Sequence, residues 1–287
     1  MTFAFFSAFL ASINDALNKK ALKEIDEYTI SWLITFLTFL FMVPLILISG
    51  IPAVKSGFWI ALLVDGTLNA FAQVLYLKAI KDSDLSKCIP VLAFLPVFLL
   101  FTSSFMLNEK VGALGIFGVV LIAAGSYVLN IQGAKEGILT PFALLFKDKG
   151  PRIMLIISLI YSITSNYDKI GVRSSSAFFW IFAINGYIAL LLFPLLILVI
   201  KKSDNFTWNF KPVLQITPVA LINLAALIFQ MVAVGRTLVS YVISIKRLNT
   251  VFSVLIGYFI FKEKRIHEKL IGVAIMLMGV ILITVFK

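Results

Sequence analysis

Apolar runs long enough to cross a bilayer recur along this chain from one end to the other. A transmembrane helix needs about 20 consecutive apolar residues, and splitting the sequence at its charges, prolines and glycines gives ten such runs. Hydrophobic residues make up 61% of the 287 positions and charged residues only 14%, whereas a soluble domain carries about 25% charged residues. The sequence therefore predicts an all-α membrane protein.

The predicted helices follow one another closely and leave no room for a soluble domain. The longest polar-flanked connection, 132–151, separates five helices at 1–131 from five helices at 152–287. To within a few residues, the ten helices are predicted at 2–19, 29–50, 56–79, 86–107, 111–131, 152–170, 175–200, 212–235, 238–261 and 266–286.

The two halves of the chain resemble each other. LNEK at 107–110 and FKEK at 261–264 each end an apolar helix and precede a helix with a Gly-x6-Gly spacing. Because five crossings is an odd number, the second copy must enter the membrane in the opposite orientation, and inverted repeats place the substrate site near the midplane. We therefore expect ten transmembrane helices in two inverted five-helix repeats. At an offset of 154 residues the matching pairs are Asn69 with Asn223, Ala79 with Ala233, Glu109 with Glu263, Gly118 with Gly272, and Gly125 with Gly279.

The charged and reactive side chains argue against several functions. The net charge of +11 comes from Lys and Arg residues between the apolar runs, which is typical of membrane topology and not of a nucleic-acid surface. A metal-dependent membrane enzyme needs clustered acids, but Asp65 is the only acid well inside a predicted span. We expect no enzyme activity, cofactor, metal or nucleic-acid partner.

The basic residues also bear on orientation. Odd-numbered loops between the predicted spans hold 17 Lys and Arg residues, while even-numbered loops and the termini hold six. The positive-inside rule then places both termini outside the cytoplasm.

Lys246 and Arg247 stand side by side within the apolar stretch 238–261. Each charge at the centre of a membrane helix costs about 2.5–3.5 kcal/mol, so the pair requires a reason. Snorkelling to the membrane surface is one explanation, although Lys246 lies about 12 Å from the nearer helix end. We favour a cationic site that faces a cavity, completed by Ser244 and Thr250 on the same helix, since intramembrane charges usually mark function.

A second polar stripe is predicted on the third helix. Asp65, Asn69, Gln73 and Tyr76 fall on one helical face, and the eighth helix offers Asn223 and Gln230, seven residues apart. Amide groups also hold transmembrane helices together, at about 0.6 kcal/mol for each bond. Four aligned polar groups, one of them ionisable, favour a wet cavity instead.

Asp65 admits two hypotheses. Without a cation beside it, its carboxyl group would take up a proton and could carry that proton with the substrate. Beside Lys246 or Arg247 it would stay ionised and act as a latch, released when a substrate anion binds the cation. The excess of basic over acidic groups in the spans favours the latch.

Other residues are assigned to packing, gating or the cavity wall. We expect the third, fourth, eighth and ninth helices to line the cavity, and the glycines to let the peripheral fifth and tenth helices approach their neighbours closely. Glu109 and Glu263 are expected to tether loops at the membrane surface. Pro90 and Pro96 loosen the fourth helix, either for gating or as a static kink. The aromatic residues that line the cavity or form an interface belt are Trp32, Tyr161, Tyr167 and Trp180.

Ten helices in two repeats, each with a Glu after its fourth helix and a Gly-x6-Gly fifth helix, resemble the EamA family of the drug/metabolite transporter superfamily. The resemblance covers essentially the whole chain and implies both termini inside, against the charge count. The Lys246–Arg247 pair is similar to the phosphate-binding pair of the triose-phosphate and nucleotide-sugar branch; their counterparts in the first half are Leu92 and Ala93.

The resulting hypothesis is a secondary transporter that moves a small organic anion, or a metabolite with an anionic group, by alternating access. A broad amino-acid or drug exporter and a lipid flippase remain the alternatives. The expected partners are a small-molecule substrate and the lipid bilayer, for a monomer or homodimer in a prokaryotic plasma membrane.

Overall fold

The computed structural model describes residues 1–82, 89–131, 148–202, 210–252, 255 and 266–285, and all regular structure in these ranges is helical. The all-α prediction is therefore confirmed. Ten α-helices and one 3-10 helix are described: α1 (Thr2–Ala21), α2 (Glu27–Ser49), α3 (Gly57–Asp82), η1 (Ile89–Phe94), α5 (Leu95–Leu107), α6 (Ala113–Ile131), α8 (Lys149–Ser174), α9 (Ala177–Lys202), α10 (Lys211–Arg236), α11 (Val239–Lys246) and α13 (Ile266–Val285).

Four helical segments in the described ranges are long and apolar enough to cross a membrane. They are Glu27–Ser49, Gly57–Tyr76, Ala177–Leu198 and Lys211–Arg236. Large apolar side chains cover the outside of the bundle: Phe105 is 93% exposed and Ile48 is 86% exposed. A surface of this kind is stable against lipid and not against water.

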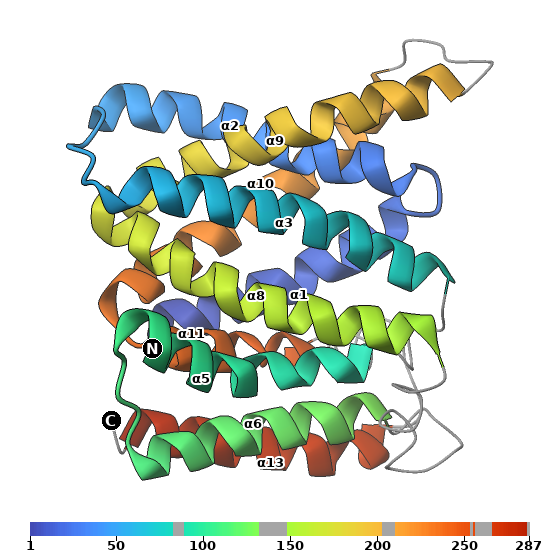
Figure 1. Cartoon of the computed structure of the whole chain (residues 1–287). Helices are drawn as coiled ribbons and strands as arrows, with labels where there is room; N and C mark the ends of the chain where they lie inside the picture. Colours follow the sequence, from blue (N-terminus) through green and yellow to red (C-terminus); the bar gives the residue numbers. More distant parts are fainter. Residues whose placement is uncertain (83–88, 132–147, 203–209, 253–254, 256–265, 286–287) are drawn as a thin grey trace.

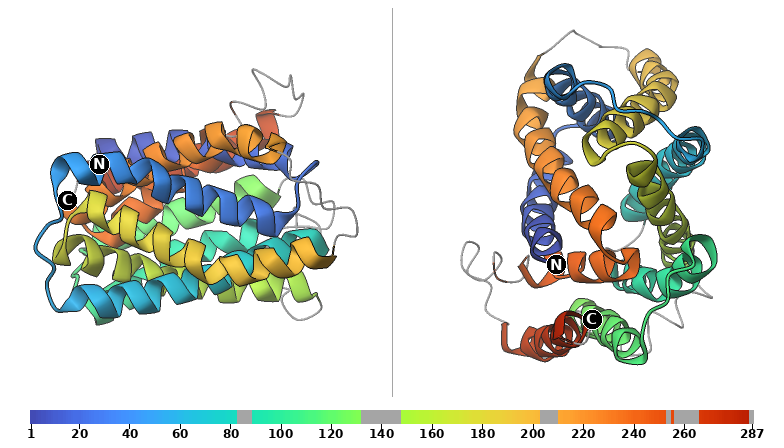
Figure 2. Two further views of the ribbon diagram at one scale, coloured as in Figure 1. Left: turned by 90° about the horizontal axis from the view of Figure 1, so that it is seen from above. Right: turned by 90° about the vertical axis from the view of Figure 1, so that its left-hand side faces the viewer.

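The helices run side by side and pack mainly between the first and the second half of the chain (Figure 1). α2 packs on α9 at one edge of the bundle, and α6 packs on α13 at the opposite edge. Between these edges α1 packs on α10, α3 on α8 and α5 on α8. The end-on view in Figure 2 shows α6 and α13 together at one edge of the bundle, where α6 also packs on η1, α5 and α11.

Glycines bring α6 and α13 into backbone contact, which confirms their predicted packing role. A Cβ atom added at Gly118 would lie 2.8 Å from the carbonyl oxygen of Gly279, and one at Gly125 would lie 2.7 Å from that of Gly272. No side chain fits at these distances, so only glycine allows the two backbones to approach this closely.

The predicted fourth helix, 86–107, is not regular in its described part. A 3-10 helix over Ile89–Phe94 precedes α5, which begins at Leu95 with Pro96 in its first turn. Proline lacks an N–H group and clashes with the carbonyl group four residues earlier, so a regular α-helix begins beside Pro96 and does not run through it.

The predicted ninth helix, 238–261, is also wrong as a continuous element. α11 ends at Lys246, and a turn at Arg247 and Leu248 precedes a further helical stretch at 249–252. At the turn, the amide of Arg247 donates to the carbonyl of Ser244 at 3.0 Å, and that of Leu248 to Ile245 at 2.9 Å. These three-residue spacings tighten the backbone, and no proline or glycine signals the change.

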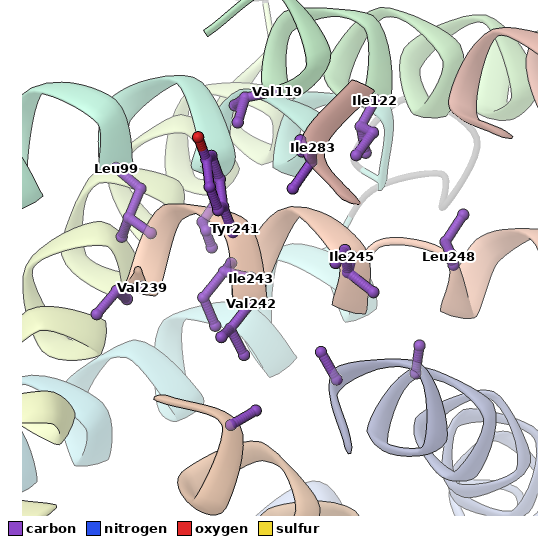
Figure 3. Close-up of a cluster of buried hydrophobic side chains, with 14 of the residues drawn as sticks. Leu99, Val119, Ile122, Val239, Tyr241, Val242, Ile243, Ile245, Leu248 and Ile283 are labelled. Carbon is purple, nitrogen blue, oxygen red and sulfur yellow. The ribbon is translucent and has the colours of Figure 1, made fainter. Parts of the chain in front are cut away.

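α11 lies within the largest cluster of buried apolar residues in the described part of the chain. Every residue from Val239 to Ile245 is buried, and the cluster adds residues of α1, α5, α6 and α13. Figure 3 shows side chains leaving α11 in several directions, among neighbours such as Leu99 of α5 and Ile283 of α13. A helix that is buried on all sides is held firmly by its surroundings, which fixes the position of the cations at its end.

Candidate functional site

Lys246 and Arg247 lie where α11 stops, inside the bundle. The Lys246 ammonium group donates a hydrogen bond of 2.5 Å to Oε1 of Gln230 on α10. Gln230 lies six residues, or about 9 Å of helical rise, before the end of α10, and it is only 6% exposed. The structure thus joins two predicted site residues from different helices, and this arrangement disfavours snorkelling.

Asp15 of α1 is the acid that acts on both cations. Its carboxylate interacts electrostatically with Lys246 and Arg247, and its Oδ2 accepts a hydrogen bond of 3.0 Å from Asn249. The prediction that Asp65 is the only acid well inside a span left Asp15 out. It lies six residues before the end of α1, and the polar spacing with Asn18 could have identified this face.

Two tyrosines complete the surroundings of Arg247. Tyr76 of α3, a predicted site residue, and Tyr161 of α8 interact electrostatically with its guanidinium group. Together with Asp15, they bring groups from three helices to one cation. Four separate helices, α1, α3, α8 and α10, therefore converge on the end of α11.

Asp65 has different neighbours from those expected. It is fully buried, and its Oδ1 accepts a hydrogen bond of 2.7 Å from Asn69. Its other polar neighbour is the carboxyl group of Asp168 on α8, so the predicted latch between Asp65 and a cation is wrong in this conformation. Tyr76 is the residue of this stripe that reaches Arg247, and it lies eleven residues, or about 16 Å, further along α3.

The remaining predicted residues are divided between packing and open polar groups. The Ser244 hydroxyl donates to its own helix at Ser240, at 2.6 Å. Asn223 bridges Asn14 of α1 and Thr38 of α2 at 3.5 Å each, while Thr250 bonds Asn249 at 3.4 Å. These bonds favour the packing interpretation for Ser244 and Asn223. Gln73 differs, since its buried Oε1 has no partner among the described residues.

Two predicted cavity aromatics have defined hydrogen bonds. Trp180 donates from Nε1 to Oδ1 of Asp168 at 2.7 Å, a contact that the sequence did not predict. Trp32 donates to the backbone carbonyl of Ala189 at 3.1 Å, which ties α2 to α9 and is a packing role.

Glu109 and Lys169 form a buried ion pair near the start of α11. The Lys169 ammonium group donates to Glu109 and, at 2.6 Å, to the carbonyl oxygen of Thr237. Glu109 also accepts from the amide of Val239 at 3.1 Å. Glu109 therefore tethers its loop to the protein interior, where both side chains are at most 5% exposed, and not to the membrane surface as expected; Glu263 lies outside the described residues.

Metal-binding chemistry has no support in the described part of the chain. No three His, Cys, Asp or Glu side chains gather there as a metal site requires. The polar groups that do converge are ammonium, guanidinium, phenol, amide and carboxyl groups, whose chemistry is that of hydrogen bonding and charge pairing.

Comparisons with known proteins point to one family. A model of the EamA-like transporter family matches residues 1–131 and 149–285. No curated protein matches the chain. A solved structure described only as "Crystal structure of protein" is similar over 99% of this chain and 97% of its own, with a TM-score of 0.78 and 16% identity. At that identity the likeness concerns the fold alone.

Proposed function

Because the chain belongs to the EamA-like transporter family, and is thus a membrane transporter, we propose that it carries a small organic anion or a metabolite with an anionic group. The observation that carries the proposal is the Lys246–Arg247 pair at an interrupted helix inside the bundle. In transporters, interrupted helices form substrate sites at the membrane midplane.

The charge around the interruption favours an anion. Asp15 is the acid that acts on both cations, and it also accepts a bond from Asn249. Among the described residues, ion pairs at bonding distance involve Lys169 and Lys211, not Lys246 or Arg247. Asp168 also acts on Lys246, but neither Asp15 nor Asp168 forms an ion pair at bonding distance with either cation in the described ranges, so a substrate anion can bind both cations directly. Asp15 thereby takes the latch role first considered for Asp65.

Alternating access between two inverted repeats is part of the proposal. The packing of α1 on α10 has its counterpart in that of α3 on α8, and the packing of α5 on α8 has its counterpart in that of α1 on α11. In two further pairs, α2 with α9 and α6 with α13, a helix of the first half packs on the helix at the same place in the second half. The two segments matched by the family model, 1–131 and 149–285, agree with this division. Rocking of one half against the other would then expose the cations to each side in turn.

The test begins with ligand binding to the purified full-length protein. Inorganic phosphate, glycerol 3-phosphate and malate are compared with lysine and choline by thermal shift. We expect stabilisation by at least one anion, lost in Lys246→Ala and Arg247→Ala and kept in Lys55→Ala, an exposed lysine. Uptake of the stabilising anion into proteoliposomes then measures transport.

The same screen separates the alternatives. Stabilisation by lysine or choline alone would favour the amino-acid or drug exporter. Movement of a fluorescent lipid between leaflets, with no anion bound, would favour the flippase. Either result overturns the anion proposal.

A further inference from the structure

Two carboxyl groups from different helices meet inside the protein, Asp65 on α3 and Asp168 on α8. They lie within hydrogen-bonding range of each other, and Asp65 is fully buried. Carboxylates have only acceptor oxygens when ionised, so a hydrogen bond between two of them requires a proton on one. Two negative charges in contact at a buried site also repel strongly. The contact itself therefore calls for a proton.

The other oxygens of the pair are held by neutral donors. Asn69 donates to Oδ1 of Asp65 and Trp180 donates to Oδ1 of Asp168. The ring of Trp180, a residue of α9, packs against α8 at Gly171. Only glycine leaves room for it, because a Cβ atom at Gly171 would lie 2.1 Å from the ring. Oδ2 of Asp65 is buried and has no donor among the described residues. That oxygen is the open position for the proton.

Few charges surround the pair. Lys246 of α11 interacts electrostatically with Asp168. Lys169, the next residue on α8, is occupied by Glu109. From α9, Tyr187 packs against Gly66 beside Asp65, with its hydroxyl 3.2 Å from that of Thr67. In the described part of α3, α8, α9 and α11, no cation contacts Asp65 to replace the proton.

We propose that Asp65 and Asp168 share one proton at neutral pH and form the proton-binding site that couples anion transport to a pH gradient. The coupling rests on the proposed function, and it runs through Lys246. An anion bound to Lys246 weakens the positive field at Asp168, which makes the shared proton bind more strongly. By linkage, the proton then strengthens anion binding by the same factor, so the two move together.

The proton site is tested without any substrate, by infrared spectroscopy of the full-length protein in nanodiscs at neutral pH. Wild-type protein should show the carbonyl band of a protonated carboxyl group. Asp65→Asn should lose this band, because Asp168 alone keeps the Trp180 donor and ionises. Glu24→Gln, which removes an exposed carboxyl group, should keep the band unchanged.

A second variant covers the case in which Asp65→Asn does not fold. Asp168→Asn exchanges the carboxylate acceptor of the bond for an amide and should shift the frequency of the band. A wild-type protein without the band, or a band that neither variant changes, overturns the proposal.

Coupling is measured separately, by proton uptake from weakly buffered solution at an alkaline pH at which the infrared band has disappeared, because a pair that already holds its proton can take up none. The anion among phosphate, glycerol 3-phosphate and malate that stabilises the protein should cause protons to be taken up, and Lys246→Ala should abolish that uptake. Binding with no uptake, or with proton release, refutes the coupling. If none of the three anions binds, the proposed function fails while the infrared result still decides the proton pair.

Discussion

The predicted fourth and ninth helices both depart from a regular α-helix, at positions 154 residues apart, yet only one of these two interruptions carries charge. In the fourth segment η1 gives way to α5 at Leu95; in the ninth α11 ends at Lys246 and helical structure resumes at Asn249. The residues at the first interruption, Leu92 and Ala93, are apolar and at most 7% exposed. The interruption thus does not depend on charge, and the cations are an addition to it.

The two interruptions also differ in their local cause. Pro96 stands in the first turn of α5 and enforces the first one. The second has no proline, and its turn is made by three-residue backbone bonds at Arg247 and Leu248. Both places therefore have an irregular backbone whether or not charge is present, and we assign Lys246 and Arg247 to the proposed anion site.

The largest effect is expected when the second interruption is given the residues of the first. The double variant Lys246→Leu, Arg247→Ala should lower uptake of the transported anion at least about 100-fold, because loss of a charged partner costs about 2–5 kcal/mol. Its thermal stability should stay equal or rise, since two desolvated charges are removed. Proteoliposome uptake and thermal unfolding measure both. Normal uptake would falsify the ligand role of the pair.

The next largest effect is expected at the Glu109–Lys169 ion pair, at the start of α11. Glu109→Gln leaves the Lys169 ammonium group buried without its counter-charge, so we expect a loss of about 3–5 kcal/mol in unfolding free energy. Lys110→Gln, at the neighbouring exposed residue, should change little. The double variant Glu109→Gln, Lys169→Met should recover much of the loss. A loss below about 1 kcal/mol in Glu109→Gln would show that the pair does not anchor α11.

The proline of the first interruption should matter less for stability. Pro96 occupies a position where its missing N–H group has no helical partner, so Pro96→Ala should change the unfolding free energy by no more than about 1 kcal/mol. Denaturant unfolding of the variant measures this. Stabilisation by about 3 kcal/mol would instead place the proline inside a strained helix and remove the distinction between the two interruptions.

The smallest effect is expected at Glu24, which, like Glu109, pairs with a lysine but is exposed. Its bond with Gln215 and its pairing with Lys211 lower the pKa of Glu24 from its usual 4.5. A depressed pKa stabilises the folded state above the unfolded value, and the contribution is lost as the pH falls through the folded value. Acid unfolding curves of wild type and Glu24→Gln should therefore converge below about pH 4. A difference that grows towards low pH contradicts this sign.

Local sequence signals predicted the helices and one of their contacts. Apolar runs between charges located the helices closely, apart from the interruptions of the predicted fourth and ninth helices. The glycines of α6 and α13 identified a backbone contact because no other residue fits there. The interruption at Arg247 was not predictable, since neither proline nor glycine marks it. The partners of Asp65 and Glu109 were missed for another reason. Which buried groups meet depends on helix packing between distant parts of the chain.

The contact between α6 and α13 has a mechanical consequence. At these glycines a carbonyl oxygen of one helix lies against the backbone of the other, so no side chain separates the two helices at these points. Sliding by even a residue would drive larger groups into backbone, so this seam resists shear. If one half rocks against the other as proposed, α6 and α13 would serve as a pivot of fixed width, and other helices, α11 with its cations among them, would take up the displacement.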